Sequence, residues 1–291
     1  MLFCAVISLL LYVTFGLYAA ETLTAADGKT IPKGGLIEVV KCSADGKAVY
    51  TTDIPVGSKL YVKEISTDNS YILSDSKYPV EFIYAGDKVA AVVITVNDGE
   101  SIENNLIRGS VEGLKVGELG SAVEGAEFGL FSADTTEFTK ENAILIATSD
   151  KDGIFRFDNL PYGKWLIKEM SVDSRYVLSD EIFIAEIKAD GDVIKIKVVN
   201  KFVTGSIEIT KTDKDTGNKL SGAVFEVYRD VNENKVFDAD IDTLCGTLTE
   251  SETEKGVYSL GELRYGGYFL HEAESPEYYL VNDRYHYFAM V

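Results

Sequence analysis

Segments about 100 residues apart repeat one another in this 291-residue chain, and this internal repeat constrains the fold more than any other feature. One block aligns without a gap at an offset of 96 residues, and two shorter blocks occur three times each. The matching segments are 102–115 with 198–211; 55–64, 161–169 and 265–272; and 15–18, 128–131 and 225–228. The period is longer than the roughly 20–50 residues of solenoid repeats. We therefore predict three tandem domains, at 1–105, 106–203 and 204–291.

Within each repeat the sequence predicts β-strands. Residues 193–200 largely alternate apolar and polar side chains, as do 206–211 and, more loosely, 165–169, and this period of two is typical of half-buried strands. The chain has 25 Gly and, together, 31 Tyr and Phe, which suits short strands joined by glycine turns. Residues 139–147 could form one short turn of helix. We predict an all-β protein in which each domain is a sandwich of roughly seven strands.

Composition argues against several classes of function. Acidic residues outnumber basic ones by 47 to 28, and a net charge of −19 repels phosphate backbones, so nucleic-acid binding is not expected. Two histidines leave little for a His-based metal or proton-transfer site. Cys4, Cys42 and Cys245 lie far apart, with no CxxC or Cys/His cluster, so neither a disulfide framework nor a zinc site is expected.

Polar residues fall on the core-facing side of three different strands. The alternation of side chains along a strand puts Lys211 on the same face as the isoleucines before it. The same count places Glu64, Glu169 and Glu272 in phase with apolar residues, and Asn200 likewise in its own strand. These groups could lie at strand ends, where a core-facing side chain still reaches water. Their recurrence at matching positions favours a chemical role, because buried charges are costly unless they are paired.

A lysine, a glutamate and an asparagine that are buried together can form a covalent bond. Burial depresses the pKa of a lysine and raises that of a glutamate. The neutral lysine amine can then attack the carboxamide carbon, while a protonated glutamate polarises the carbonyl and shuttles protons. Ammonia leaves and an isopeptide bond remains. Because this is a single intramolecular event without turnover, we do not predict an enzyme.

These features together resemble a known family, the collagen-adhesin B-type domains of Gram-positive surface proteins, also called SpaA-like or prealbumin-like domains. The matching elements are Lys115 or Lys211 opening a domain, the segment 125–131, residues 160–163 before Glu169, and 198–200 closing the domain. The resemblance implies tandem transthyretin-like or inverse immunoglobulin-like β-sandwiches, in which a self-formed Lys–Asn bond joins the first and last strands. Domains of this family commonly form the stalks of adhesins and pilins.

The resemblance assigns the full set of bond-forming residues to the middle domain. Lys115 and Asn200 would be the partners, and Glu169 would be the proton shuttle. The linked positions are 85 residues apart, and the chain-entropy model for disulfides gives such a closure a value of about 4–5 kcal/mol. A bond of this kind would take the place of the missing disulfides.

The two outer domains have incomplete sets in this sequence. The third contains Lys211 and Glu272, and its acceptor would fall 31 to 40 residues after the glutamate, beyond the last residue given. The first contains Glu64 and Asn104, and its lysine would fall at about position 1 or 2, where the sequence has Met1-Leu2. On this sequence we expect neither outer domain to close its own bond.

The first residues have two interpretations. Residues 1–11 are an apolar run followed by small residues near position 20, as in a secretory signal peptide, although the positive n-region is lacking. Residues 15–18, however, align with a core strand of both later repeats, which favours a truncated or misassigned start. The run is too short and too poorly flanked for a predicted membrane span.

The third repeat contains a loop with a partial calcium-binding pattern. Asp230, Asn232, Asn234 and Asp238 occupy positions 1, 3, 5 and 9 of such a loop. A lysine replaces the turn glycine, and an isoleucine stands where the bidentate acid would be. The favoured interpretation is an acidic hairpin loop without metal, and calcium binding is the alternative. No other cofactor is predicted.

The sequence therefore predicts structural stalk or spacer domains of an extracellular, cell-wall-associated adhesin or pilin-like protein. Its partners would be host extracellular matrix or other surface proteins, reached through regions outside this sequence. The alternative is a secreted binding module that recognises host matrix protein or glycan. Loss of saturable binding on removal of an exposed aromatic would distinguish this alternative from a stalk.

Overall fold

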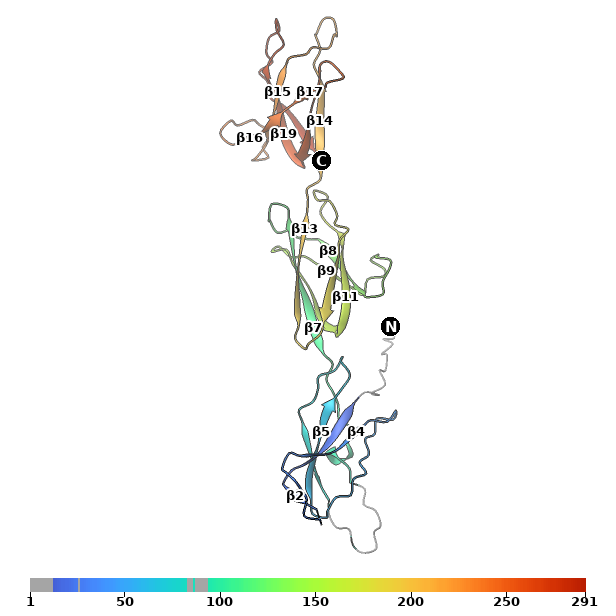
Figure 1. Ribbon diagram of the computed structural model, residues 1–291. Helices are drawn as coiled ribbons and strands as arrows, with labels where there is room; N and C mark the ends of the chain where they lie inside the picture. The colour runs from blue at the N-terminus through green and yellow to red at the C-terminus, as the bar shows by residue number, and fades with distance from the viewer. Residues whose placement is uncertain (1–12, 26, 83–85, 87–93) are drawn as a thin grey trace. The chain divides into compact units, whose positions relative to one another are not determined.

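The computed structural model describes residues 13–25, 27–82, 86 and 94–291 (Figure 1). Its N-terminal part contains a four-stranded sheet in which Phe15, Leu17, Leu60 and Val62 point into one core. The sheet consists, in order, of β4 (Leu36–Lys41), β1 (Thr14–Ala19), β5 (Lys59–Ser66) and β6 (Lys77–Glu81). A small hairpin and one 3-10 turn accompany it: β2 (Leu23–Thr24), β3 (Thr30–Ile31) and η1 (Asn97–Gly99). Residues 15–18 therefore form part of a core strand, as the repeat predicts.

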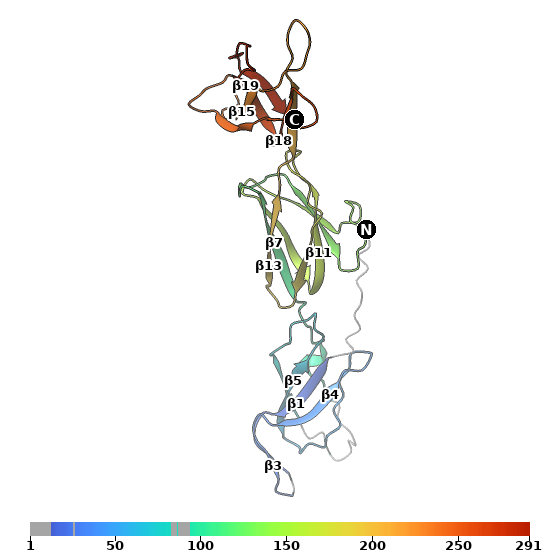
Figure 2. The ribbon, with the colours of Figure 1, turned by 45° about the horizontal axis from the view of Figure 1, so that its top comes forward.

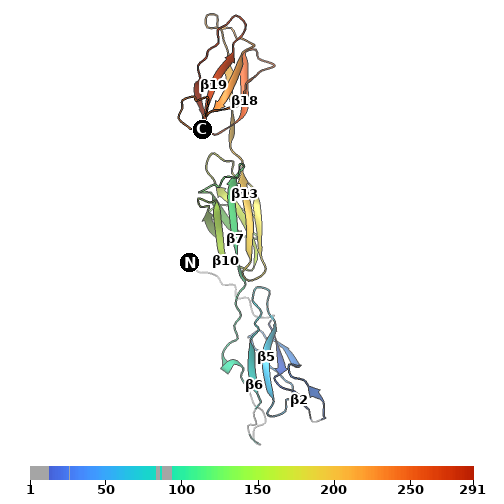
Figure 3. The same ribbon diagram turned by 90° about the vertical axis from the view of Figure 1, so that its left-hand side faces the viewer.

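The middle of the chain forms two sheets. The three-stranded sheet has the order β10 (Ile154–Pro161), β7 (Arg108–Gly117) and β13 (Val193–Asn200). The four-stranded sheet has the order β12 (Ile182–Ile187), β11 (Gly163–Ser171), β8 (Glu127–Ser132) and β9 (Leu145–Thr148). Figures 2 and 3 show the central strand β7 next to β13. The first and last strands of this part are thus direct neighbours.

The C-terminal part also forms two sheets. The three-stranded sheet has the order β14 (Thr204–Thr210), β18 (Val257–Arg264) and β17 (Thr249–Glu250). The four-stranded sheet has the order β16 (Thr243–Thr247), β15 (Val224–Arg229), β19 (Gly266–Glu274) and β20 (His286–Met290). The protein is therefore an all-β series of tandem β-sandwich domains, which confirms the predicted fold class.

The repeat in the sequence corresponds to a repeat in strand register. In the first sheet Phe15 of β1 lies opposite Glu64 of β5, and in the C-terminal sheet Phe225 of β15 lies opposite Glu272 of β19. The strand orders β4-β1-β5-β6, β9-β8-β11-β12 and β16-β15-β19-β20 are equivalent. Because register fixes which face a side chain occupies, the glutamates share the core face of their sheets.

Aromatic stacking fills the core of the middle sandwich. Phe128 and Phe155 are buried and stack with ring centroids 3.7 Å apart. Gly113 on β7 provides the space, because a Cβ atom there would lie 2.0 Å from the ring of Phe155. Gly153 lies in the turn before β10, at φ +78°, where a Cβ would lie 2.2 Å from the carbonyl oxygen of Lys115. Only glycine fits this turn, which holds the lysine backbone in place.

Residues 139–147, where one short turn of helix was considered, form a single hydrogen-bonded turn followed by a strand. The amides of Asn142 and Ala143 both bond to the carbonyl of Thr139, and residues 145–148 then form strand β9 beside β8. The β-branched and aliphatic residues of this segment favour a strand when a neighbouring strand offers hydrogen bonds.

Each sheet draws its strands from a single predicted domain. Packing of the chain, however, divides it into two compact units. One comprises residues up to 112 with 157–165 and 184–194, and the other comprises 113–156, 166–183 and 195–291. The boundaries at 105/106 and 203/204 therefore stay a prediction.

Candidate functional site

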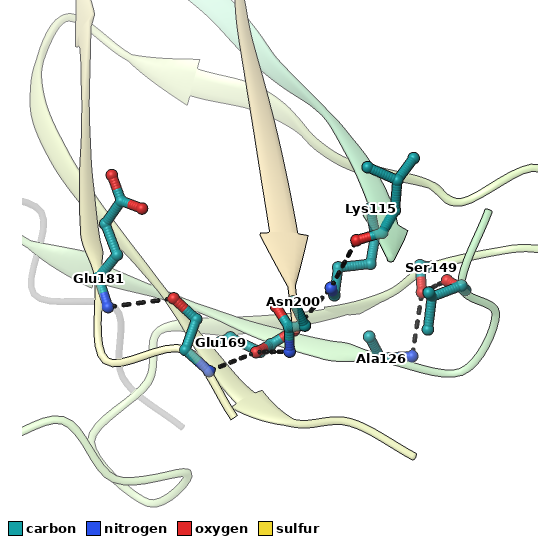
Figure 4. Close-up of polar contacts among 9 residues, drawn as sticks. Lys115, Ala126, Ser149, Glu169, Glu181 and Asn200 are labelled. Carbon is teal, nitrogen blue, oxygen red and sulfur yellow. Dashed lines mark hydrogen bonds and ion pairs between the residues drawn. The ribbon is translucent and has the colours of Figure 1, made fainter. Parts of the chain in front are cut away.

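The three side chains assigned to the middle domain come together in its interior (Figure 4). Lys115 comes from β7, Glu169 from β11, and Asn200 is the last residue of β13. Their exposed fractions are 0%, 1% and 1%. The inward orientation that strand parity predicts for Glu169 and Asn200, and that the repeat extends from Lys211 to Lys115, is therefore present in the structure.

The carboxylate of Glu169 lies between the amine and the carboxamide. Its Oε1 is 3.5 Å from Nζ of Lys115, and its Oε2 accepts a hydrogen bond of 2.7 Å from Nδ2 of Asn200. The amine also donates to the carbonyl oxygen of Val116 at 3.3 Å. One carboxylate can thus exchange protons with the nucleophile on one side and with the leaving nitrogen on the other.

Burial lowers the pKa of the Lys115 amine below its ordinary value, and the charge of Glu169 opposes part of that shift. A lowered pKa increases the fraction of neutral amine, which is the nucleophilic form. Nζ also lies 5.9 Å from the ring centre of Tyr176, which stacks on Phe202 at 4.8 Å. These rings add apolar surface around the amine.

The geometry differs in one respect from the predicted mechanism. Glu169 bonds to the amide nitrogen of Asn200, whereas the sequence-based hypothesis placed it on the carbonyl oxygen. Oδ1 of Asn200 is buried and has no hydrogen-bond partner in the described part of the chain. The arrangement therefore equips the glutamate to transfer protons rather than to polarise the carbonyl.

The C-terminal sandwich contains two of the three groups, the lysine amine and the glutamate carboxylate. Nζ of Lys211 lies 2.6 Å from Oε1 of Glu272, and the lysine side chain is partly exposed. A pocket of about 250 Å³ lies beside this ion pair. Its lining comprises Ile209, Thr210, Lys211, Phe225, Leu270, Glu272, Asn282 and His286.

The first sandwich has the carboxylate and the carboxamide. Nδ2 of Asn104 donates to both oxygens of Glu64, at 2.8 and 3.0 Å, and also lies 3.0 Å from the hydroxyl of Thr67. The position where the lysine was expected, Met1-Leu2, lies outside the described residues. The site residues of the outer domains therefore form two different incomplete sets.

A backbone contact common to all three glutamates was missed at the sequence level. In each domain Oε2 accepts a hydrogen bond from the N–H ten residues further on. The donors are Ser74, Ser179 and Asn282, at 2.8, 2.8 and 3.1 Å. The pattern Tyr-x-x-Ser/Asn-Asp at 71–75, 176–180 and 279–283 marks their positions in the sequence.

The calcium-like loop is held by its own backbone. The carboxylate of Asp230 accepts from the N–H groups of Asn234 and Lys235, and that of Asp242 accepts from Val231 and Asp238. Asp230 and Asp242 are buried, whereas Asn232 and Asn234 are exposed. In the described residues no three His, Cys, Asp or Glu side chains are grouped so as to hold a metal ion.

Fold and site together define a class, tandem prealbumin-like β-sandwich domains with a buried Lys–Glu–Asn group in the middle domain. A model of the SpaA family, described as a prealbumin-like fold domain, matches residues 109–202 and again 205–290, more than half of the chain. The chain belongs to this family. Its described residues contain no helix long and apolar enough to cross a membrane.

Several solved structures are similar to this chain. The Bacillus anthracis TIE protein is 25% identical with a TM-score of 0.63, and the match covers 97% of this chain but 45% of that one. A streptococcal ancillary pilin is 19% identical with a TM-score of 0.31, covering 96% and 88%. GBS52, a minor pilin of Streptococcus agalactiae, is 18% identical with a TM-score of 0.30, covering 66% and 83%. No curated protein matches the chain.

Proposed function

We propose that the chain is a structural stalk segment of a cell-surface, pilin-like or adhesin protein, whose middle domain is closed by a Lys115–Asn200 isopeptide bond. Membership of the SpaA family supports the structural role. One observation supports the cross-link. The fully buried carboxylate of Glu169 lies between a buried amine and a buried carboxamide, 3.5 Å from Nζ of Lys115 and 2.7 Å from Nδ2 of Asn200.

The reaction follows from this geometry. Oε1 of Glu169 takes a proton from the Lys115 ammonium, and the neutral Nζ attacks Cγ of Asn200. Oε2 then delivers a proton to Nδ2, the C–N bond to this nitrogen breaks, and ammonia leaves. The new secondary amide loses the second amine proton to the carboxylate. The balance is one ammonium, one primary amide and one carboxylate converted to one secondary amide, ammonia and a protonated glutamate, which then passes its proton to ammonia or solvent.

A bond at this place would carry load between neighbouring strands. Lys115 and Asn200 lie near the C-terminal ends of β7 and β13, which are adjacent in one sheet. Tension on this domain enters at the start of β7 and leaves at the end of β13, so it would otherwise shear these two strands past each other. A covalent link between them makes the domain a spacer that resists extension, without any disulfide.

Intact mass of the purified full chain tests the proposal. We expect the mass to be lower than the sequence mass by about 17 Da, the mass of one ammonia, and Glu169→Ala should restore the full value. The same type of change at an exposed neighbour, Lys201→Met, should keep the loss. Peptide mapping should recover Lys115 joined to Asn200. An unchanged mass in wild-type protein would refute the cross-link, while the stalk role would remain.

A secreted binding module remains the alternative function. The observation that favours it is a turn after β19 where Tyr278 and Leu280 are 95% and 94% exposed. Large apolar side chains that protrude in this way are typical of contact surfaces. Saturable binding to matrix protein or glycan that Tyr278→Ala abolishes would support the binding module, and no saturable binding would support the stalk.

A further inference from the structure

Strand β9 leaves one edge of the middle domain's four-stranded sheet open. It is the terminal strand of that sheet, and its hydrogen-bonded neighbour is β8, with Phe128 opposite Ala147 and Gly129 opposite Ile146. An edge strand has a row of backbone N–H and C=O groups that no strand of its own sheet uses. Such a row is a template for another β-strand.

The side chains of this edge are aliphatic and exposed. Ile144, Leu145 and Ile146 are consecutive, and they are 53%, 46% and 42% exposed. No charged residue occurs between Glu141 and Asp150, although charged residues make up 26% of the chain. Natural edge strands usually carry charges or proline that prevent pairing with other chains. This strand has neither.

The equivalent edges of the other two sandwiches differ. Strand β4 in the first domain carries Glu38 and Lys41. Strand β16 in the third is interrupted by Gly246 and has one large exposed aliphatic residue, Leu244. The uncharged aliphatic edge is therefore not a property that the shared fold requires.

The sequence of the edge is self-complementary. Residues 143–147, of which the last three belong to β9 and Ile144 bonds through its amide to the carbonyl of Leu130, read Ala-Ile-Leu-Ile-Ala, which is a palindrome centred on Leu145. When two copies pair antiparallel about this residue, leucine faces leucine, each Ile144 faces Ile146, and each alanine faces an alanine. Large side chains then meet large ones, and all five pairs are uncharged, which matters for two chains that each carry −19.

We propose that β9 is a self-association strand, through which the middle domains of two copies of this chain pair antiparallel about Leu145. The two four-stranded sheets would become one continuous eight-stranded sheet. The contact is isologous, so it closes at two copies. Because a single strand pair is a small interface, we expect association in the micromolar to millimolar range. The inference does not depend on the Lys–Asn bond.

Sedimentation velocity of the full chain, followed over that concentration range, tests the proposal. Wild-type protein should shift from monomer to dimer. Leu145→Lys should raise the dissociation constant at least about 10-fold, because two like charges would face each other across the twofold axis. Ile184→Lys, at a 66% exposed residue of the opposite edge strand β12, should leave the dissociation constant unchanged.

Two double variants test the register. I144K/I146E places opposite charges face to face in both pairs, so dimerisation should be retained. I144K/I146K places like charges in both pairs and should abolish it. All four positions are exposed in the single chain, so each variant should unfold at the same denaturant concentration as wild type. Monomer at every concentration, growth beyond a dimer, or equal behaviour of the two double variants would overturn the proposal.

Discussion

Removing the proposed Lys115–Asn200 closure of the middle sandwich should lower its free energy of unfolding by about 4–5 kcal/mol. Lys115 and Asn200 enclose a loop of 85 residues, and the chain-entropy model gives this value for a loop of that length. The perturbation is the pair Lys115→Met and Glu169→Gln. Methionine alone would leave a carboxylate that is 1% exposed without its cation, at a separate cost of about 3–5 kcal/mol. The double variant avoids that cost because both of its new side chains are neutral.

The single tryptophan of the chain makes the assay specific to this domain. Trp165 lies on β11, so its fluorescence during guanidinium titration reports unfolding of the middle sandwich. Exposed Lys201→Met is the matched control and should change the free energy by less than about 0.5 kcal/mol. The mass of each sample is measured in parallel. A difference below about 1 kcal/mol, in wild-type protein whose mass shows the bond, would refute the argument from loop closure.

Three further predictions concern the same domain and the calcium-like loop. In Asn200→Ala, Lys115 stays a free amine, and burial lowers its pKa from 10.5, so below that pH the unfolded state binds more protons than the folded state. The free energy of unfolding, measured by urea titration, should therefore rise relative to wild type as the pH increases from about 7 to 10. Parallel pH profiles of the two proteins would contradict this. Gly113→Ala places a Cβ 2.0 Å from the Phe155 ring and should lower the free energy of unfolding, followed by Trp165 fluorescence, by about 1–3 kcal/mol or more. The control Gly120→Ala, which has no atom within 4 Å but a φ of +87°, should lower it by about 1 kcal/mol. Equal losses of stability in the two variants would show that the core relaxes around the new methyl group. Millimolar calcium should give no binding heat in calorimetry, because the carboxylates of Asp230 and Asp242 already accept hydrogen bonds from backbone N–H groups. Saturable heat that Asp230→Asn removes would establish a calcium site.

The fold class could be predicted because two independent periods agree. The alternation within 193–200 predicts a strand, and β13 has those bounds. The repeat of about 100 residues predicts which strands are equivalent, and the matching registers of Phe15 with Glu64 and of Phe225 with Glu272 confirm that equivalence. The segment 139–147 was harder, because a short aliphatic run has no clear period and its strand depends on β8.

The burial of the site residues was predictable, but their partners were only partly so. Strand parity gives the face of Glu169 and Asn200, and the repeat gives Lys115 the face that parity gives Lys211; Lys115, Glu169 and Asn200 are all buried. Parity says nothing of which carboxylate oxygen meets which atom, so the contact of Glu169 with the amide nitrogen needed coordinates. The recurring Tyr-x-x-Ser/Asn-Asp pattern marks the position of the backbone donor at Ser179, but the pattern does not say that this N–H group bonds to Glu169.

The common backbone contact separates two roles of the glutamate. Glu64, Glu169 and Glu272 all accept an N–H ten residues on, although their lysine and asparagine partners differ. The carboxylate therefore ties its strand to the following turn in every domain, whatever chemistry accompanies it. Removal of Glu64 should destabilise the first sandwich even though no lysine is described beside it, because the part-buried N–H of Ser74 would lose its acceptor. A core-facing glutamate thus marks this fold, and a predicted isopeptide bond additionally requires lysine and asparagine on adjacent strands of the same domain.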